Sequence, residues 1–258
     1  MRAVDDPITV PAISRAAAIL GQLADAGGAP LTVSELARRL DLPKSSTANL
    51  CLALESERLL SRSESGFLLG RRLVELGGAY LASIDQVKAF YAACRMQPHI
   101  SRQTARVAVL DGMDVLYLAR YDGAQPIRLT ANIGDRFPAH CTATGKALLA
   151  RLAPEVLEER LRGRHLVGLT ERSITDPVAL RAELQRVREA GHAVDDEEAT
   201  PDVTCVALAV PGLRTDSDWF AISVTSVTSA LTSHARTTLL AELTAVAHAL
   251  GNPLIDIA

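Results

Sequence analysis

The sequence has few cysteines and no segment that marks a secreted or membrane-spanning protein. Its four cysteines form no Cys-x-x-Cys pair, which argues against a structural zinc site or a disulfide framework. The longest apolar runs, such as 205–210, are far too short to cross a bilayer. The N-terminal stretch MRAVDDPITV carries two acidic residues and lacks the apolar region of a secretory signal. These absences favour a reduced cytoplasmic protein, and we expect no cofactor or metal.

The chain also lacks an overall basic excess, since its formal net charge at pH 7 is −3. This argues against a protein that holds nucleic acid through a wholly basic surface. Between residues 38 and 72, however, seven basic residues stand against four acidic ones. That local excess suits one DNA half-site, but a monomer would bind weakly. We therefore expect a homodimer or a dimer of dimers (a homotetramer).

The stretch 32–60 predicts two short helices separated by a tight break. Thr32 and Glu35 have the spacing of a capping box, so the first helix is expected to run from Thr32 to about residue 40. Pro43 ends the break and is tolerated in the first turn of a helix. A second helix is expected over 44–57, and its exposed face opens with Lys44, Ser45, Ser46, Thr47 and Asn49. Such groups suit phosphate oxygens and base edges, which indicates a helix-turn-helix that reads DNA with its second helix.

A winged version of this motif is predicted by the flanking sequence. A helix over 13–26 precedes it, and residues 59–69 predict a β-hairpin with a polar tip. Arg62 on this wing is placed to meet the DNA backbone or minor groove. We assign residues 1–70 to the DNA-binding domain, 71–83 to a linker helix and 84–258 to a second domain. Alternatively, 71–83 is a fourth helix of the first domain.

Residues 84–258 mix helical and strand patterns in a way typical of an α+β fold with an antiparallel sheet. The helices are expected at 86–101, 144–152, 154–161, 177–190 and 237–250. Asp176 and Gly191 mark the two ends of helix 177–190. The strands are expected at 104–110, 115–121, 127–130, 192–194, 203–210 and 219–227, with Asp111-Gly112 as the turn between the first two.

Two of these strands predict a ligand site. Alternation puts Ser223 and Thr225 on one face of 221–227, and Cys205 on a face of small residues in 203–210. Such a face leaves space for a cavity. The alternative is that Ser223 and Thr225 point to water from a half-exposed sheet.

Two further segments are candidates for the same site. The loop 140–145 leads into a helix whose free N–H groups favour an anion, and Gly145 would let the backbone come close. An ordinary capped helix is the alternative there. Asp195 opens the acidic run 195–198, for which the alternative is a solvated turn.

Five stretches of the sequence are informative when they are considered together. They are LPKSS (42–46) with 50–60, GFLLGRRLVELG (66–77), HCTATGKALLA (140–150), GHAVDDEE (191–198), and CVA (205–207) with AISVT (221–225). In this order, over nearly the whole chain, they resemble the IclR family of bacterial transcription regulators. The resemblance implies a GAF-like effector-binding and oligomerisation domain after the winged helix-turn-helix. It also implies an effector pocket lined by Ala143, Thr144, Asp195, Val203, Cys205, Ser223 and Thr225.

The sequence departs from the family pattern at two positions. The reading helix usually carries a basic or imidazole-bearing pair where this chain has Ala48 and Asn49, although Asn49 can bond adenine through two hydrogen bonds. Thr225 stands where a serine is common, and its methyl group narrows the pocket. An anionic effector beside Asp195 is acceptable if Asp195 meets a hydroxyl or if the two acids share a proton.

The leading hypothesis is a DNA-binding transcription regulator, with repression as the first expectation. A small organic acid, aliphatic or aromatic, would control its binding to an inverted-repeat operator on double-stranded DNA. We expect neither enzymatic activity nor a membrane partner. One alternative is a hydrolase with Cys205 as nucleophile, His140 or His192 as base and Asp195 orienting the base. Another is a dimeric DNA-binding protein that senses no effector.

Overall fold

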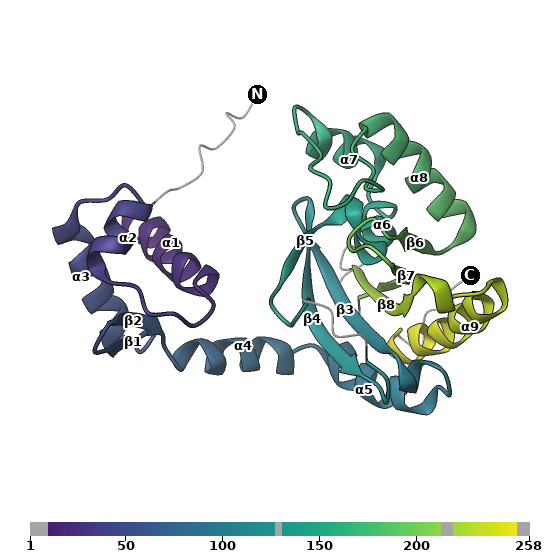
Figure 1. Cartoon of the computed structure of the whole chain (residues 1–258), viewed down its shortest axis with the longest axis horizontal. Helices are drawn as coiled ribbons and strands as arrows, with labels where there is room; N and C mark the ends of the chain where they lie inside the picture. The colour runs from purple at the N-terminus through teal and green to yellow at the C-terminus, as the bar shows by residue number, and fades with distance from the viewer. Residues whose placement is uncertain (1–9, 127–130, 213–218, 252–258) are drawn as a thin grey trace, which may run out of the picture. The chain divides into compact units, whose positions relative to one another are not determined.

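The computed structural model describes residues 10–126, 131–212 and 219–251 (Figure 1). These residues form two compact units that divide between Ser83 and Ile84. The last helix before the division is grouped with the first unit, so a separate linker segment stays a prediction. The expected strand at 127–130 lies outside the described residues. None of the described helices combines the length and apolar character needed to cross a membrane.

The first unit is a winged helix-turn-helix, as predicted. Its helices are α1 (Pro11–Asp25), α2 (Val33–Arg39) and α3 (Lys44–Ser56). The capping box is confirmed, because the Glu35 backbone N donates to Thr32 Oγ1 at 3.2 Å and the Thr32 backbone N donates to Glu35 Oε2 at 2.8 Å. Pro43 is the residue before α3 rather than part of its first turn. The wing is an antiparallel hairpin of β1 (Leu60–Ser63) and β2 (Gly66–Leu69).

Helix α4 (Arg72–Ala82) is fixed to the wing at its start. The Gly70 backbone N donates to Leu59 O at 2.7 Å, and a Cβ on Gly70 would lie 2.1 Å from Arg58 O. Glu75 then pairs with both Arg58 and Arg72 at 3.4 and 2.6 Å. Beyond this junction none of the α4 residues is buried.

The second unit is built on one antiparallel sheet in the order β5-β4-β3-β8-β7-β6. Its strands are β3 (Thr104–Asp111), β4 (Asp114–Asp122), β5 (Arg136–Pro138), β6 (Ala193–Asp196), β7 (Val203–Pro211) and β8 (Trp219–Val227). The Asp-Gly hairpin is confirmed by the pairing of β3 with β4 across Gly112, whose φ is +67°. Strand β5 was not predicted, since three residues are too few to show alternation.

Helices cover both faces of this sheet (Figure 1). Helices α5 (Asp85–Met96) and α9 (Ser233–Leu250) contact each other and the sheet on one face. Helix α6 (Ala143–Leu149) lies on the other face with α7 (Pro154–Leu161) and α8 (Pro177–Ala190), where they share a core with inward side chains of the central strands.

The predicted helix ends hold where a local signal marks them. The Ala179 backbone N donates to Asp176 Oδ2 at 2.8 Å, and Gly191 adopts φ +72° just past α8. Helix α5 stops at Met96 rather than at 101, because Pro98 disfavours helical geometry at the residue before it. Helix α6 is shorter than predicted and ends at Leu149.

Candidate functional site

The exposed face of α3 differs in part from the predicted reading face. Lys44, Ser45 and Asn49 are exposed, and Ser46 is half-buried. Thr47 is fully buried, and its hydroxyl donates to Pro43 O at 3.1 Å. The prediction that the Thr47 side chain faces DNA is therefore wrong, because that side chain points to the core of the unit.

Leu52 completes this face and was missed. It lies seven residues after Ser45 and three after Asn49, so all three share one side of the helix. Its relative exposure is 52%, which is high for a leucine in a folded domain. An exposed leucine can make apolar contact with a thymine methyl group. Sequence reasoning assigns leucines to the core, so the exposure became visible only once the burial of Cys51 and Leu54 fixed the orientation of α3.

Arg62 lies on β1 of the wing and pairs with α3. Its Nε and Nη2 donate to the two carboxylate oxygens of Glu55 at 3.1 and 2.9 Å. Its guanidinium carbon is 4.6 Å from the centre of the Phe67 ring. The side chain thus lies across the wing, and its predicted contact with DNA stays a prediction.

The second unit holds a small polar cavity, partly open to solvent, between the sheet and the start of α6. The volume that water molecules can reach inside it is about 30 Å³. This is room for about two waters. Six of the seven residues named from the family resemblance line it, while Thr225 lies beside it. The lining residues are Arg106, Tyr117, Ala131, Phe137, Thr142, Ala143, Thr144, Asp195, Ala199, Thr200, Val203, Cys205 and Ser223.

Strand register explains why distant residues meet in the polar cavity. One row across the sheet joins Thr104, Thr225, Cys205 and Asp195, and the next row joins Arg106, Ser223 and Ala207. Ser223 and Thr225 are 3% and 0% exposed, so the alternative that they point to water is wrong. Cys205 lies opposite Thr225 in the register, so the small-residue face predicted for its strand is the same face of the sheet.

Arg106 is the main residue of the cavity that sequence reasoning missed. It is 3% exposed, and its Nη1 donates to Thr225 Oγ1 at 2.8 Å. Its Nε and Nη2 are buried and have no hydrogen-bond partner. An arginine in a strand usually places its charge in water, so only the packing of β3 between β4 and β8 shows that this one is enclosed.

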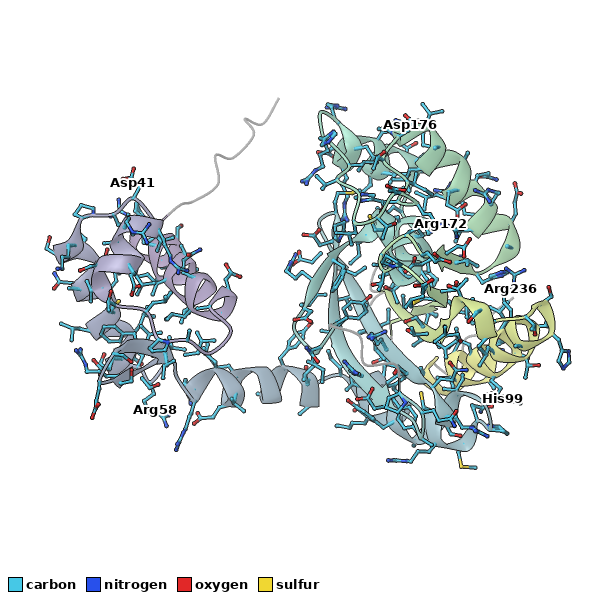
Figure 2. The ribbon with its side chains drawn as sticks, in the orientation of Figure 1. Asp41, Arg58, His99, Arg172, Asp176 and Arg236 are labelled. Carbon is cyan, nitrogen blue, oxygen red and sulfur yellow. The ribbon has the colours of Figure 1, made fainter. Side chains whose placement is uncertain are left out.

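Asp195 forms the opposite wall. It is 2% exposed, and its Oδ1 accepts hydrogen bonds from the backbone N of Glu198 and Ala199 at 2.7 and 3.2 Å. Burial raises the pKa of Asp195 to about 7, against the opposing effect of these hydrogen bonds. The alternative of a solvated turn is wrong for Asp195 and Glu198. It holds for Asp196, which is exposed and pairs at 3.0 Å with Arg172, labelled in Figure 2.

A buried ion-pair network lies behind this wall. Lys146 of α6 is 0% exposed and pairs with Glu198 Oε1 and, at 3.4 Å, with Glu183 Oε1. Burial raises the pKa of Glu198 although Lys146 opposes this effect. The backbone of Glu198 also holds Asp195, so the network positions one wall of the polar cavity. No sequence pattern joined Lys146 to carboxylates 37 and 52 positions away.

The start of α6 is an ordinary capped helix of seven residues. Thr142 Oγ1 accepts from the Gly145 backbone N at 3.0 Å, which satisfies one of the free N–H groups. A Cβ on Gly145 would lie 2.1 Å from Ala139 O. The expectation that Gly145 lets the backbone approach a ligand is therefore wrong, since the space it leaves is filled by the Ala139 backbone.

Gly145→Ala is expected to lower the free energy of unfolding by about 2–3 kcal/mol, because two backbone segments must move apart. Gly78→Ala in α4 is the matched control, since a Cβ there meets nothing within 4 Å. It should instead stabilise its helix by about 0.5–1 kcal/mol. Urea unfolding of both variants tests the pair, and an equally mild effect at both positions would contradict this account of Gly145.

The geometry gives no support to a nucleophilic Cys205. Its Sγ lies 3.4 Å from Thr225 Oγ1, and burial raises the pKa of the thiol to about 12. A nucleophilic cysteine needs the opposite shift. The two candidate bases bond elsewhere, His140 Nε2 at 3.1 Å from Val167 O and His192 Nδ1 at 3.0 Å from Ala190 O. Among the described residues no group of three or more His, Cys, Asp or Glu side chains is placed to hold a metal ion.

Comparisons with known proteins agree with both units. Residues 12–64 match the IclR helix-turn-helix domain, and residues 79–252 match the bacterial transcriptional regulator IclR C-terminal domain. The chain is 31% identical over 209 residues to the HTH-type transcriptional regulator BhcR of Paracoccus denitrificans, covering 80% of this chain and 74% of that one. It is 30% identical over 201 residues to the HTH-type transcriptional repressor AllR of Escherichia coli, covering 77% and 74%.

A solved structure extends the likeness to the whole fold. The IclR transcriptional regulator from Alicyclobacillus acidocaldarius superposes with a TM-score of 0.81 at 26% identity, covering 94% of this chain and 98% of that one. Because the C-terminal family model alone spans more than half of the sequence, the chain belongs to the IclR family of bacterial transcription regulators.

Proposed function

We propose that this regulator represses transcription by binding an inverted-repeat operator on double-stranded DNA, and that a small carboxylic acid in the polar cavity relieves the repression. The observation that carries the proposal is the polar cavity itself. It is lined by side chains from six strands and the start of α6, and these include six of the seven residues inferred from the family resemblance. Arg106 in this cavity has buried N–H groups without hydrogen-bond partners, and such groups cost stability. A bound effector would supply the missing partners.

The size of the cavity favours an aliphatic acid. Space for about two waters admits a compact acid of a few heavy atoms, whereas an aromatic acid would require Tyr117 and Phe137 to move. These two rings already pack edge to face with centres 6.0 Å apart. Control of DNA binding then requires that the acid bind more tightly to the conformation with low operator affinity.

Pairing of two chains supports operator binding. The modest basic excess around α3 makes one reading helix a weak binder, and a second copy doubles the phosphate contacts. Helix α4 offers an exposed apolar surface, with Leu76 and Tyr80 on one face exposed by 49% and 53%. We propose that this surface pairs two copies. A dimer of dimers through the second unit would extend the same arrangement.

The test begins with selection of bound duplexes from a random double-stranded DNA library. An inverted repeat is expected, because dimer symmetry is copied in the operator. Asn49→Ala should weaken binding to the selected operator by about 1–3 kcal/mol and relax the base preference at one position per half-site. Ser56→Ala, at the exposed far end of α3, is the control and should bind as wild type does.

The effector arm measures fluorescence anisotropy of the labelled operator with aliphatic and aromatic carboxylic acids. Release by one class of acid supports the proposal and names the class. Operator binding that no acid changes would leave a DNA-binding protein without an acid effector. Enrichment of no sequence at all would contradict the operator itself.

A further inference from the structure

Arg106 is a buried cation whose hydrogen bonds are incomplete in a specific way. A guanidinium has five N–H groups, and Nε and Nη2 together form its side edge, the pair of donors that matches the two oxygens of a carboxylate. In Arg106 these are the two nitrogens without a partner. Nη1 is held by Thr225 Oγ1 at 2.8 Å, so the orientation of the free edge is fixed before any ligand arrives.

Leaving such an edge unpaired is costly for the protein. A buried donor without a partner costs stability, and more when the group is charged. Arg106 lines the polar cavity, and its register neighbour on β8, Ser223, also lines it. A solvated surface arginine would avoid the cost, so the arrangement is best explained by a group that occupies the edge when the cavity is filled.

We infer that Arg106 binds the effector carboxylate side-on through Nε and Nη2, and that Asp195 at the opposite wall restricts the other end of the effector to an uncharged polar group. The polar cavity thereby selects compact monocarboxylates over both neutral analogues and dicarboxylates. This inference rests on the proposed function and adds the residue that determines specificity.

The spacing of the strands sets the distance between the part of the cavity at Arg106 and the part at Asp195. Arg106 reaches Thr225 on β8, and Asp195 lies on β6, two strands away across β7. Neighbouring strands are about 4.8 Å apart, so the backbones of β8 and β6 are roughly 10 Å apart. Both side chains line the same cavity, so a compact ligand with a carboxylate and a second oxygen can meet both of them.

The groups around Asp195 decide what it can accept. Its Oδ1 is occupied by two backbone N–H groups, and among the described residues nothing donates to Oδ2. Glu198 and Lys146 interact with its charge from behind, and Tyr117 and Cys205 do so from the cavity, which Arg106 also lines. Because burial already favours the protonated form, a nearby effector carboxylate favours it further, and the neutral carboxyl can donate to a carbonyl or hydroxyl oxygen. A second carboxylate in that position would force two acids together.

The experiment measures thermal unfolding of the full chain with pyruvate, lactate and butyrate, and with lactamide and malonate as the neutral and dianionic comparisons. Wild type should gain stability with at least one monocarboxylate and with neither comparison, since a ligand of the folded state raises the midpoint. Arg106→Met should weaken binding of that acid by roughly 100-fold, the equivalent of two strong hydrogen bonds. Arg106→Lys keeps the positive charge but lacks the planar pair of N–H donors, so it should lose most of the same affinity.

A second readout separates a ligand-binding role from a structural one. Without ligand, Arg106→Met should unfold at the same temperature as wild type or higher, because it removes an unpaired buried charge. A purely structural arginine would give a lower midpoint. Arg136→Met, at an exposed arginine of the same sheet, is the control and should respond to the acid as wild type does.

The outcomes separate the role of Arg106 from the proposal of an acid effector. If wild type responds to a monocarboxylate and Arg106→Met responds equally, the role of Arg106 is wrong and the acid effector stands. A response to malonate or lactamide as strong as that to lactate overturns the selectivity. If no acid in the set shifts wild type, the acid effector and the role of Arg106 are both wrong.

Discussion

Lys146→Met is expected to lower the free energy of unfolding by about 3–5 kcal/mol, the usual cost of removing one partner from a buried ion pair. Lys146 is fully enclosed, and its ammonium is shared between Glu198 and Glu183. Methionine fills a similar volume but leaves both carboxylates without their cation. Glu183 keeps a second partner in Arg186, whereas Glu198 Oε2 already lacks one.

The loss should depend on pH with a definite sign. Lys146 lowers the pKa of Glu198, so the variant raises that pKa above its already raised value. A carboxyl with a raised folded-state pKa loses stability as pH rises towards that pKa. Urea unfolding at pH 5 and pH 8 should therefore show the larger deficit at pH 8.

Two further variants test whether the loss of stability is specific to the buried ion-pair network. Glu198→Gln in the same background should recover part of the loss, since an amide needs no cation. Lys88→Met, where the lysine is exposed beside Asp85, should change stability by less than about 0.5 kcal/mol. A Lys146→Met protein as stable as wild type at both pH values would contradict the buried network.

Asp195→Asn is expected to stabilise the protein at both pH 5 and pH 8, and by clearly more at pH 8. Asparagine keeps an oxygen for the backbone N–H groups of Glu198 and Ala199, so the local geometry survives. The pKa of Asp195 is about 7 in the folded protein against an ordinary value of 3.8. The folded state therefore holds a proton that the unfolded chain releases between about pH 4 and pH 7.

Stability of wild type must fall with rising pH across that window, because the folded state binds more protons there. Above pH 7 the full cost of the buried charge is present, at most about 4 kcal/mol for three pH units. Unfolding of both proteins between pH 5 and pH 8.5 should show a difference that grows to about pH 7 and then levels off. Asp196→Asn, at an exposed position of the same strand, is the control. A difference that is constant with pH would mean that Asp195 titrates normally.

Local signals in the sequence were enough for much of the fold. Thr32 with Glu35, Asp176 and Gly191 each act within four residues, so the helix ends that they mark could be predicted. Alternation likewise placed Ser223 with Thr225 on one face of their strand and Cys205 on a face of small residues in its own, since the period of a strand needs no knowledge of its neighbours. The predicted face and the observed cavity wall therefore agree.

The missed residues depend on contacts between distant segments. Arg106 meets Thr225 across 119 positions, and Lys146 meets Glu198 across 52. A charged residue in a strand or helix is normally solvated, so nothing local distinguishes these two from the exposed arginines and lysines nearby. The prediction for Thr47 was wrong because a short polar side chain is not always exposed. Its hydroxyl can donate to a carbonyl of the preceding helical turn, which allows the side chain to face the core.

The junction of α4 with the wing bears on how a signal can travel inside the first unit. Gly70 leaves no clearance against the Arg58 backbone, and Glu75 ties the first turn of α4 to both Arg58 and Arg72. Arg62 in turn ties β1 to Glu55 of α3. The close backbone approach at Gly70 and these ion pairs therefore connect α4, the hairpin and α3 to one another. If two copies pair as proposed above, a rotation of α4 is expected to move α3 with it, and so to shift the two reading helices relative to successive major grooves.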